Sequence, residues 1–163
     1  MSKSIPAPPE ASQTEESEIL EQLKAAAVGT QSAGMEIPPP VFRFMEGKLE
    51  SYEPGKSLRV SFPVKAEYNN PLQRMQGGMI AAAIDNTMGP LSFLVTRGAA
   101  VTLSMTLEYV RGIADGKRLF VEASVLSRSR TNLIMEAVAS DERGKMVARA
   151  TAQFQLFRMR EAK

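Results

Sequence analysis

The segment that most restricts the fold runs from Met75 to Thr96, "MQGGMIAAAIDNTMGPLSFLVT", and its only charged residue is Asp85. The Gly77-Gly78 pair marks where a helix begins, and the apolar run after it is long enough for several helical turns. A helix this apolar must be buried against other elements. We therefore expect a buried helix with one carboxylate, Asp85, in its middle.

Short segments with strand-like composition flank this helix. Two precede it, 43–54 and 56–64, and four follow it, 101–110, 118–128, 132–141 and 145–157. Segment 101–110, "VTLSMTLEYV", alternates most clearly, so we expect a half-buried strand there. Five or six antiparallel strands around one inserted helix predict an α+β fold.

The N-terminal part has a different composition. Residues 1–14 are polar and Pro-rich, which predicts a flexible tail, and 16–29 has apolar residues at helical spacing, ending at Gly29. The segment "IPPPVF" (37–42) is expected to be extended because of its prolines. The predicted organisation is a tail plus short amphipathic helix over 1–40 and one domain over 41–160.

Two residue types are missing and exclude whole classes of chemistry. The chain has no Cys and no His, which removes disulfides, thiolate nucleophiles, His bases and His- or Cys-ligated metals. The net charge is +2 with no block of like charges, so no nucleic-acid partner is expected. No signal peptide or convincing membrane span is visible, which favours a cytoplasmic protein without membrane contact.

The Gly77-Gly78 pair and Asp85 together suggest a site. The first turn of a helix has free N–H groups and a partial positive charge, and glycine lets a carbonyl oxygen approach them. Asp85 lies seven residues past Gly78, so both face the same side, but roughly 10 Å apart along the axis. One helix therefore cannot bring both to one substrate, and two antiparallel copies could. The alternatives are a plain tight turn and a structural acid.

These residues resemble the hotdog-fold acyl-CoA thioesterases, specifically the phenylacetate-pathway, PaaI-like branch. That family shows N-x-x-G-x-x-H-G-G with an acid eight residues after the first of the paired glycines, and Asn70, Gly77 and Asp85 fit this spacing. The resemblance covers about 42–157, including "DERGKMVARATAQF". Two positions differ, since Gln73 replaces a glycine and Gln76 replaces the histidine.

The resemblance implies roles for individual residues. Asp85 would be the nucleophile or general base, the Gly77 N–H with Gly78 would stabilise the oxyanion, and Asn70 would position the carbonyl or water. Gln76 in place of the histidine leaves this mechanism possible. Thr102 would lie near the lytic water, although a solvent-facing strand Thr is equally ordinary.

The same resemblance implies how an acyl-CoA would bind. Arg128, Ser129 and Arg130 would contact the pantetheine and phosphate end of CoA, although such a turn is often only solvated. Met79 and Met88 would line a soft acyl pocket, although methionines also fill cores. The implied function is hydrolysis of a medium-chain or aromatic acyl-CoA by a homodimer or dimer of dimers, without metal or bound cofactor.

Two other functions remain open from the sequence. A non-catalytic acyl-CoA binding or sensing protein on the same fold would have the same pattern, although it gains nothing from a buried carboxylate. An interaction protein acting through the N-terminal helix is the third. The sequence leaves open the acyl chain, the choice between CoA and an acyl carrier protein, and attack by the carboxylate or by water.

Overall fold

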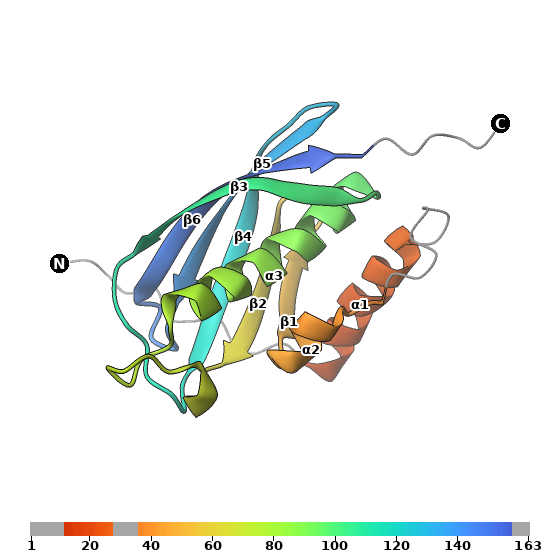
Figure 1. Cartoon of the computed structure of the whole chain (residues 1–163). Helices are drawn as coiled ribbons and strands as arrows, with labels where there is room; N and C mark the ends of the chain where they lie inside the picture. Colours follow the sequence, from red (N-terminus) through yellow and green to blue (C-terminus); the bar gives the residue numbers. More distant parts are fainter. Residues whose placement is uncertain (1–11, 28–35, 158–163) are drawn as a thin grey trace.

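The computed structural model describes residues 12–27 and 36–157, and its core is one antiparallel sheet wrapped around a long helix (Figure 1). The strands are β1 (Lys48–Glu53), β2 (Ser57–Pro63), β3 (Ala100–Tyr109), β4 (Arg118–Arg128), β5 (Asn132–Ser140) and β6 (Met146–Leu156), in the order β1-β2-β4-β5-β6-β3. The expected α+β fold, with the helix after the second strand, is confirmed.

The long helix, α3 (Gly77–Thr96), lies across the concave face of the sheet (Figure 1). Its sheet-facing residues, among them Ile84, Met88 and Leu91, are fully buried with sheet residues such as Val60 and Phe154 in one core. By length and composition alone α3 could span a membrane, but half of that window is buried inside the protein. Its apolar character is therefore that of a core helix.

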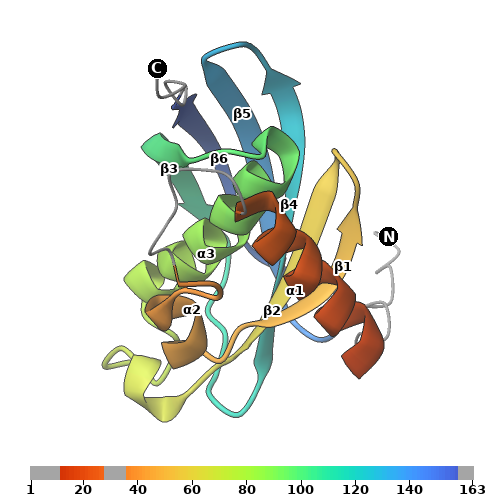
Figure 2. The same ribbon diagram turned by 90° about the vertical axis from the view of Figure 1, so that its right-hand side faces the viewer.

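An N-terminal helix, α1 (Gln13–Ala27), packs against β1 and α3 (Figure 2). Ile19 and Leu23 enter the same core. The helix begins earlier than expected because Ser12 and Glu15 form a capping box: the Ser12 hydroxyl accepts from the Glu15 N–H, and the Glu15 carboxylate accepts from the Ser12 N–H. The bonds from the Ser12 N–H and hydroxyl lower the pKa of Glu15. The flexible tail was predicted over 1–14; Gln13 and Thr14 belong to α1, whereas residues 1–11 and Gly29 lie outside the described residues.

The proline-rich segment is only partly extended, which corrects the expectation for 37–42. A short helix, α2 (Pro40–Phe44), begins directly after Pro39, whose backbone is extended. Pro40 occupies the first helical turn, where its missing N–H costs nothing and its fixed φ suits a helix. The first strand accordingly begins at Lys48 rather than near Arg43.

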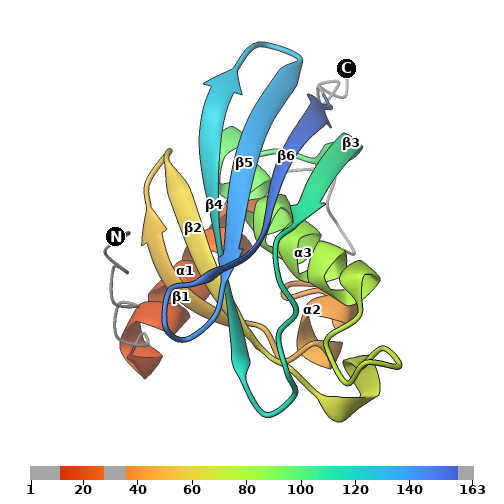
Figure 3. The same ribbon diagram turned by 90° about the vertical axis from the view of Figure 1, so that its left-hand side faces the viewer.

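Within the described residues, strand β3 forms one edge of the sheet and pairs only with β6 (Figure 3). A β-bulge lies between Thr102 and Ser104. Met105 pairs with buried Ala152, and Thr102 pairs with buried Phe154, so both face α3. Strict alternation would place Thr102 on the opposite face, and the extra residue of the bulge reverses this.

The packing of α1 gives a first stability prediction. We expect Ile19→Ala to lower the free energy of unfolding by about 2–4 kcal/mol, because it leaves a cavity in the shared core. The control Leu126→Ala, at a side chain that is 53% exposed, should change it by less than about 0.5 kcal/mol. Urea unfolding of both variants measures this, and equal small effects would mean that α1 does not contribute to the core.

Candidate active site

The glycine pair forms the first turn of α3 and leaves backbone donors free. Gln76 is the N-cap, and its side-chain Oε1 accepts from the Met79 N–H at 3.1 Å. Among the described residues, the N–H groups of Gly77 and Gly78 have no acceptor. A Cβ on Gly78 would lie 2.8 Å from the Gln76 Oε1, so glycine is needed for this cap. This end of α3 can therefore polarise a carbonyl oxygen.

A tight loop over 70–74 leads into this turn. The Asn70 Oδ1 accepts from the N–H groups of Leu72 at 2.9 Å and Arg74 at 3.2 Å, so it orders the loop. Gln73 has φ +57°, in the left-handed region that glycine adopts without cost. The family that this chain resembles has glycine at this position, and glycine adopts this conformation without strain. Gln73 adopts the same conformation with strain.

Asp85 lies on the side of α3 next to the edge strand β3, outside the part of the helix that the sheet buries, and it is exposed. This corrects the expectation of a buried carboxylate, because the sheet covers only one face of the helix. Its Oδ1 accepts from the Thr102 hydroxyl at 3.0 Å. The bulge in β3 therefore brings the two predicted residues together, and this bond fixes the orientation of the carboxylate.

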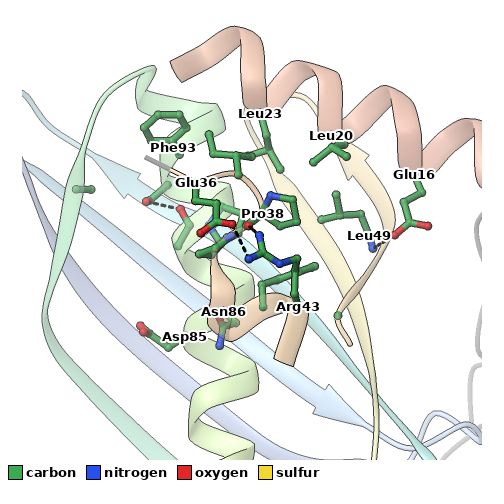
Figure 4. Close-up of a pocket in the computed structure, with 18 of the residues that line it drawn as sticks. Glu16, Leu20, Leu23, Glu36, Pro38, Arg43, Leu49, Asp85, Asn86 and Phe93 are labelled. Atoms are coloured by element: carbon green, nitrogen blue, oxygen red, sulfur yellow. Dashed lines mark hydrogen bonds and ion pairs between the residues drawn. The ribbon is translucent and has the colours of Figure 1, made fainter. Parts of the chain in front are cut away.

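A pocket of about 710 Å³ opens between α1, the segment 36–49 and α3 (Figure 4). Asp85 and Asn86 lie at one end of it, and Phe93 lies two helical turns away along α3. The wall between them is mainly apolar, and the volume is typical of a small-molecule site. The apolar lining includes Leu20, Leu23, Ile37, Pro38, Phe42, Leu49 and Phe93.

An ion pair between Arg43 and Glu36 lies in the lining of this pocket. Arg43 pairs with Glu36, and its Nη1 also donates to the Pro38 carbonyl at 2.8 Å (Figure 4). These contacts connect α2 to the segment before it, so they hold the wall opposite α3 in place.

The remaining predicted residues lie elsewhere. Arg128 donates to the Val95 carbonyl at 2.7 Å and so caps the C-terminal end of α3, whereas the Ser129 hydroxyl accepts from the Asn132 N–H at 3.0 Å within its turn. Arg130 is exposed, without a partner among the described residues. Their role in CoA binding stays a prediction.

The two methionines assigned to an acyl pocket are not in its lining. Met88 is fully buried in the core, and Met79 is partly buried against it. Met88 fills core space, which was the alternative for both, whereas Met79 lies on the same side of α3 as Asn86, two turns before it. Their role in binding an acyl group stays a prediction.

Sequence reasoning missed several residues of the site. The Tyr109 hydroxyl donates to the Gly77 carbonyl at 2.9 Å, and Asn86 lines the pocket beside Asp85. The alternation of 101–110 placed Tyr109 on the face of Met105, but nothing in it showed that this face meets the start of α3. The pocket residues of α1 had only their helical spacing as a signal.

Metal ligands are not gathered in this region. Over 12–27 and 36–157, no group of three or more carboxylates is placed to hold a metal ion. Of the three carboxylates that line the pocket, Glu36 pairs with Arg43 and Glu16 accepts from the Leu49 N–H. The chemistry available at the third, Asp85, is that of its carboxylate with the Thr102 hydroxyl, side-chain amides and backbone N–H groups.

Comparisons with known proteins agree with this fold. A sequence model of the Thioesterase superfamily matches residues 73–148. A Saccharolobus solfataricus protein named "Putative esterase" is 28% identical over 120 residues, which cover 72% of this chain and 84% of that protein.

Solved structures share the fold. The Escherichia coli PaaI protein from the phenylacetic acid degradation operon superposes with a TM-score of 0.74 at 17% identity, covering 86% of this chain and 96% of that one. A Streptococcus mutans protein bound to acetyl-CoA gives 0.64 at 23% identity, covering 69% and 90%.

The loop before α3 gives a second prediction. We expect Gln73→Gly to raise the free energy of unfolding by up to about 1 kcal/mol, because relief of the left-handed strain exceeds the entropy that glycine adds to the unfolded chain. Gln73→Val should lower it, since a β-branched residue fits this conformation worst. Thermal unfolding of both variants tests this, and the reverse order would contradict the strain at Gln73.

Proposed function

We propose that this chain, a thioester hydrolase of the thioesterase superfamily with the hotdog fold, cleaves acyl-CoA to a free acid and CoA. The observation that carries the proposal is Asp85, an oriented carboxylate at one end of a large apolar pocket. The acetyl-CoA bound to the Streptococcus mutans relative supports CoA as the carrier.

Asp85 is proposed to act on the thioester carbon. Its carboxylate either attacks that carbon directly or takes a proton from a water that attacks it. The carbonyl oxygen then becomes negatively charged, and a Gly77 N–H, with help from Gly78, stabilises it. Collapse of the tetrahedral intermediate breaks the C–S bond and releases the CoA thiolate, which takes up a proton. After attack by water this leaves the free acid, and the proton comes from the Asp85 carboxyl. After direct attack it leaves an acyl–Asp85 anhydride, which a water molecule hydrolyses to the free acid and the Asp85 carboxylate.

The reacting groups come from two copies of the chain in this proposal. Gly78 and Asp85 face the same side of α3 but lie roughly 10 Å apart along it, too far for one carbonyl group. Beside Asp85 runs the edge strand β3, whose Val101, Leu103 and Tyr109 are about half exposed. A second copy that covers this apolar edge, with its α3 antiparallel, would bring its glycine turn to this Asp85.

The other site residues support these groups. Thr102 orients Asp85, and Asn70 shapes the loop that sets the start of α3. Gln76 caps the helix through Oε1, so its Nε2 is the group left to donate to the substrate carbonyl or to water. Asn70 and Thr102 are therefore positioning residues.

The acyl group is proposed to enter the pocket under α1. Its lining is mainly apolar and includes the aromatic rings of Phe42 and Phe93, which suits a medium-chain or aromatic acyl group. A thioester held at Asp85 would have its acyl chain directed along α3 toward Phe93.

The role of Asp85 is tested by thiol release. We expect Asp85→Asn to lower kcat by at least about a hundredfold on a panel of acyl-CoAs, because the amide is neither nucleophile nor base. A thiol-reactive dye reports the released CoA, and the chain itself has no cysteine to react.

The matched control is Asp115→Asn, which makes the same change at an exposed loop residue and should leave kcat unchanged. Normal turnover by Asp85→Asn would exclude the proposed mechanism. If the wild type binds every acyl-CoA and hydrolyses none, the proposed activity is wrong.

A further inference from the structure

One tyrosine connects the edge strand β3 to the start of α3. Tyr109 is the last residue of β3, which runs alongside α3 (Figure 1). It pairs with fully buried Ala148 of β6, so its side chain lies on the face of the sheet that α3 covers. Its hydroxyl donates to the Gly77 carbonyl at 2.9 Å. Within the described part of the chain, no other side chain forms a hydrogen bond with the glycine pair.

The Tyr109 ring also packs against the glycine turn. A Cβ on Gly77 would lie 3.3 Å from the Tyr109 Cζ, so the ring is next to the bare backbone of this glycine. Directly after the tyrosine, the N–H groups of Val110 and Arg111 donate to the Val147 carbonyl at 2.8 and 3.1 Å. Tyr109 therefore belongs to a fixed piece of backbone, although its side chain is about half exposed.

The peptide unit that accepts this bond joins the two glycines. A peptide unit is planar and trans, so the Gly77 carbonyl and the Gly78 N–H lie in one plane and point in opposite directions. Neither glycine has a Cβ that would restrict rotation of this unit, and the Gly78 N–H has no acceptor among the described residues. A bond that fixes the carbonyl oxygen therefore also fixes the direction of the Gly78 N–H.

The Tyr109 hydroxyl acts through this peptide and not on a substrate. A phenolic hydroxyl has one proton, and the Gly77 carbonyl receives it, so none is left to donate to a substrate carbonyl. Acceptance of a hydrogen bond by the oxygen of a peptide also strengthens the N–H of the same peptide as a donor. The group that changes when the hydroxyl is present is therefore the Gly78 N–H.

We propose that Tyr109 is a positioning residue for the oxyanion. Its hydroxyl directs and polarises the Gly78 N–H toward the oxygen that becomes negatively charged during thioester hydrolysis. This inference rests on the proposed function, in which the N–H groups of the glycine pair stabilise that oxygen. Because the oxygen has more negative charge in the transition state than in the bound substrate, the orientation of the donor affects kcat more than binding.

Strand β3 then holds both reacting groups of α3, each by one hydroxyl. Thr102 donates to Asp85, and Tyr109 donates to Gly77. Thr102 and Tyr109 are seven positions apart, which strict alternation would place on opposite faces, and the bulge in β3 puts them on the same face. In the proposed dimer the two hydroxyls of one chain serve different sites, because its Asp85 meets the glycine turn of the other copy.

The test is Tyr109→Phe, which removes the hydroxyl and keeps the ring and its packing. We expect kcat to fall about tenfold, less than for loss of a whole oxyanion donor, and KM to change by less than about twofold. The matched control is Tyr52→Phe, at the opposite edge of the sheet, where the hydroxyl accepts from the Gly55 N–H at 3.3 Å. It should leave kcat unchanged.

Infrared spectroscopy distinguishes positioning from a purely structural role. The best acyl-CoA of the panel, with an isotope label in its thioester carbonyl, is bound to Asp85→Asn. Donors at the glycine turn should lower the frequency of the carbonyl stretch relative to free acyl-CoA in solution. Adding Tyr109→Phe should reduce this shift, and adding Tyr52→Phe should not.

The role of Tyr109 is overturned by wild-type kcat in Tyr109→Phe, by a rise in KM at constant kcat, or by an unchanged carbonyl shift. An equal fall of kcat in Tyr52→Phe would also overturn it. If the wild type hydrolyses no acyl-CoA, the proposed function is wrong and this role falls with it. Hydrolysis that depends on Asp85 but not on Tyr109 would contradict the role of Tyr109 alone.

Discussion

Burial of one face of α3 in the concave face of the sheet is the interaction on which the rest of the structure depends. Ile84, Met88 and Leu91 lose all exposure there, which is the dominant favourable term for folding. The sheet covers one face of α3 and leaves the other faces to other partners or to solvent. The strip through Gly78 and Asp85 is left on another, so the packing that stabilises the helix also presents the carboxylate.

The remaining faces of α3 have different surroundings. Helix α1 and the segment 36–49 close one of them and leave the apolar pocket, with Asp85 at its end. The side along β3 stays open in the described part of the chain, with apolar residues exposed beside Asp85. The start of the helix has N–H groups without an acceptor among the described residues. The helix thus carries both the glycine turn and Asp85 but holds them roughly 10 Å apart along its length, which is why a second copy enters the mechanism.

The sequence predicted the elements that depend on local pattern. The six strands and the start of α3 at the glycine pair follow from alternation and from glycine chemistry. Two features were not predicted, the bulge in β3 and the exposure of Asp85, because the first depends on one extra residue in a strand and the second on segments far apart in the sequence. The bulge in β3 turns Thr102 toward Asp85, although alternation gives no sign of it. The exposure of Asp85 depends on how much of α3 the sheet covers, which no local pattern in the sequence gives.

The most direct test of a site shared between chains mixes two inactive variants. Gly77→Pro removes the proposed N–H donor. The variant should fold, because Gly77 is the first residue of α3, where proline is tolerated. The preceding residue, Gln76, has φ −64° and ψ 140°, which suit a residue before proline. Gly77→Ala, which keeps the N–H, is its control. The two variants, Gly77→Pro and Asp85→Asn, are mixed, dissociated and reassociated. The mixture should then have about a quarter of wild-type activity, because half of the dimers contain one chain of each variant and each such dimer has one of its two sites intact. Activity that stays at zero in the mixture, while size measurements show mixed dimers, would mean that each site lies within one chain.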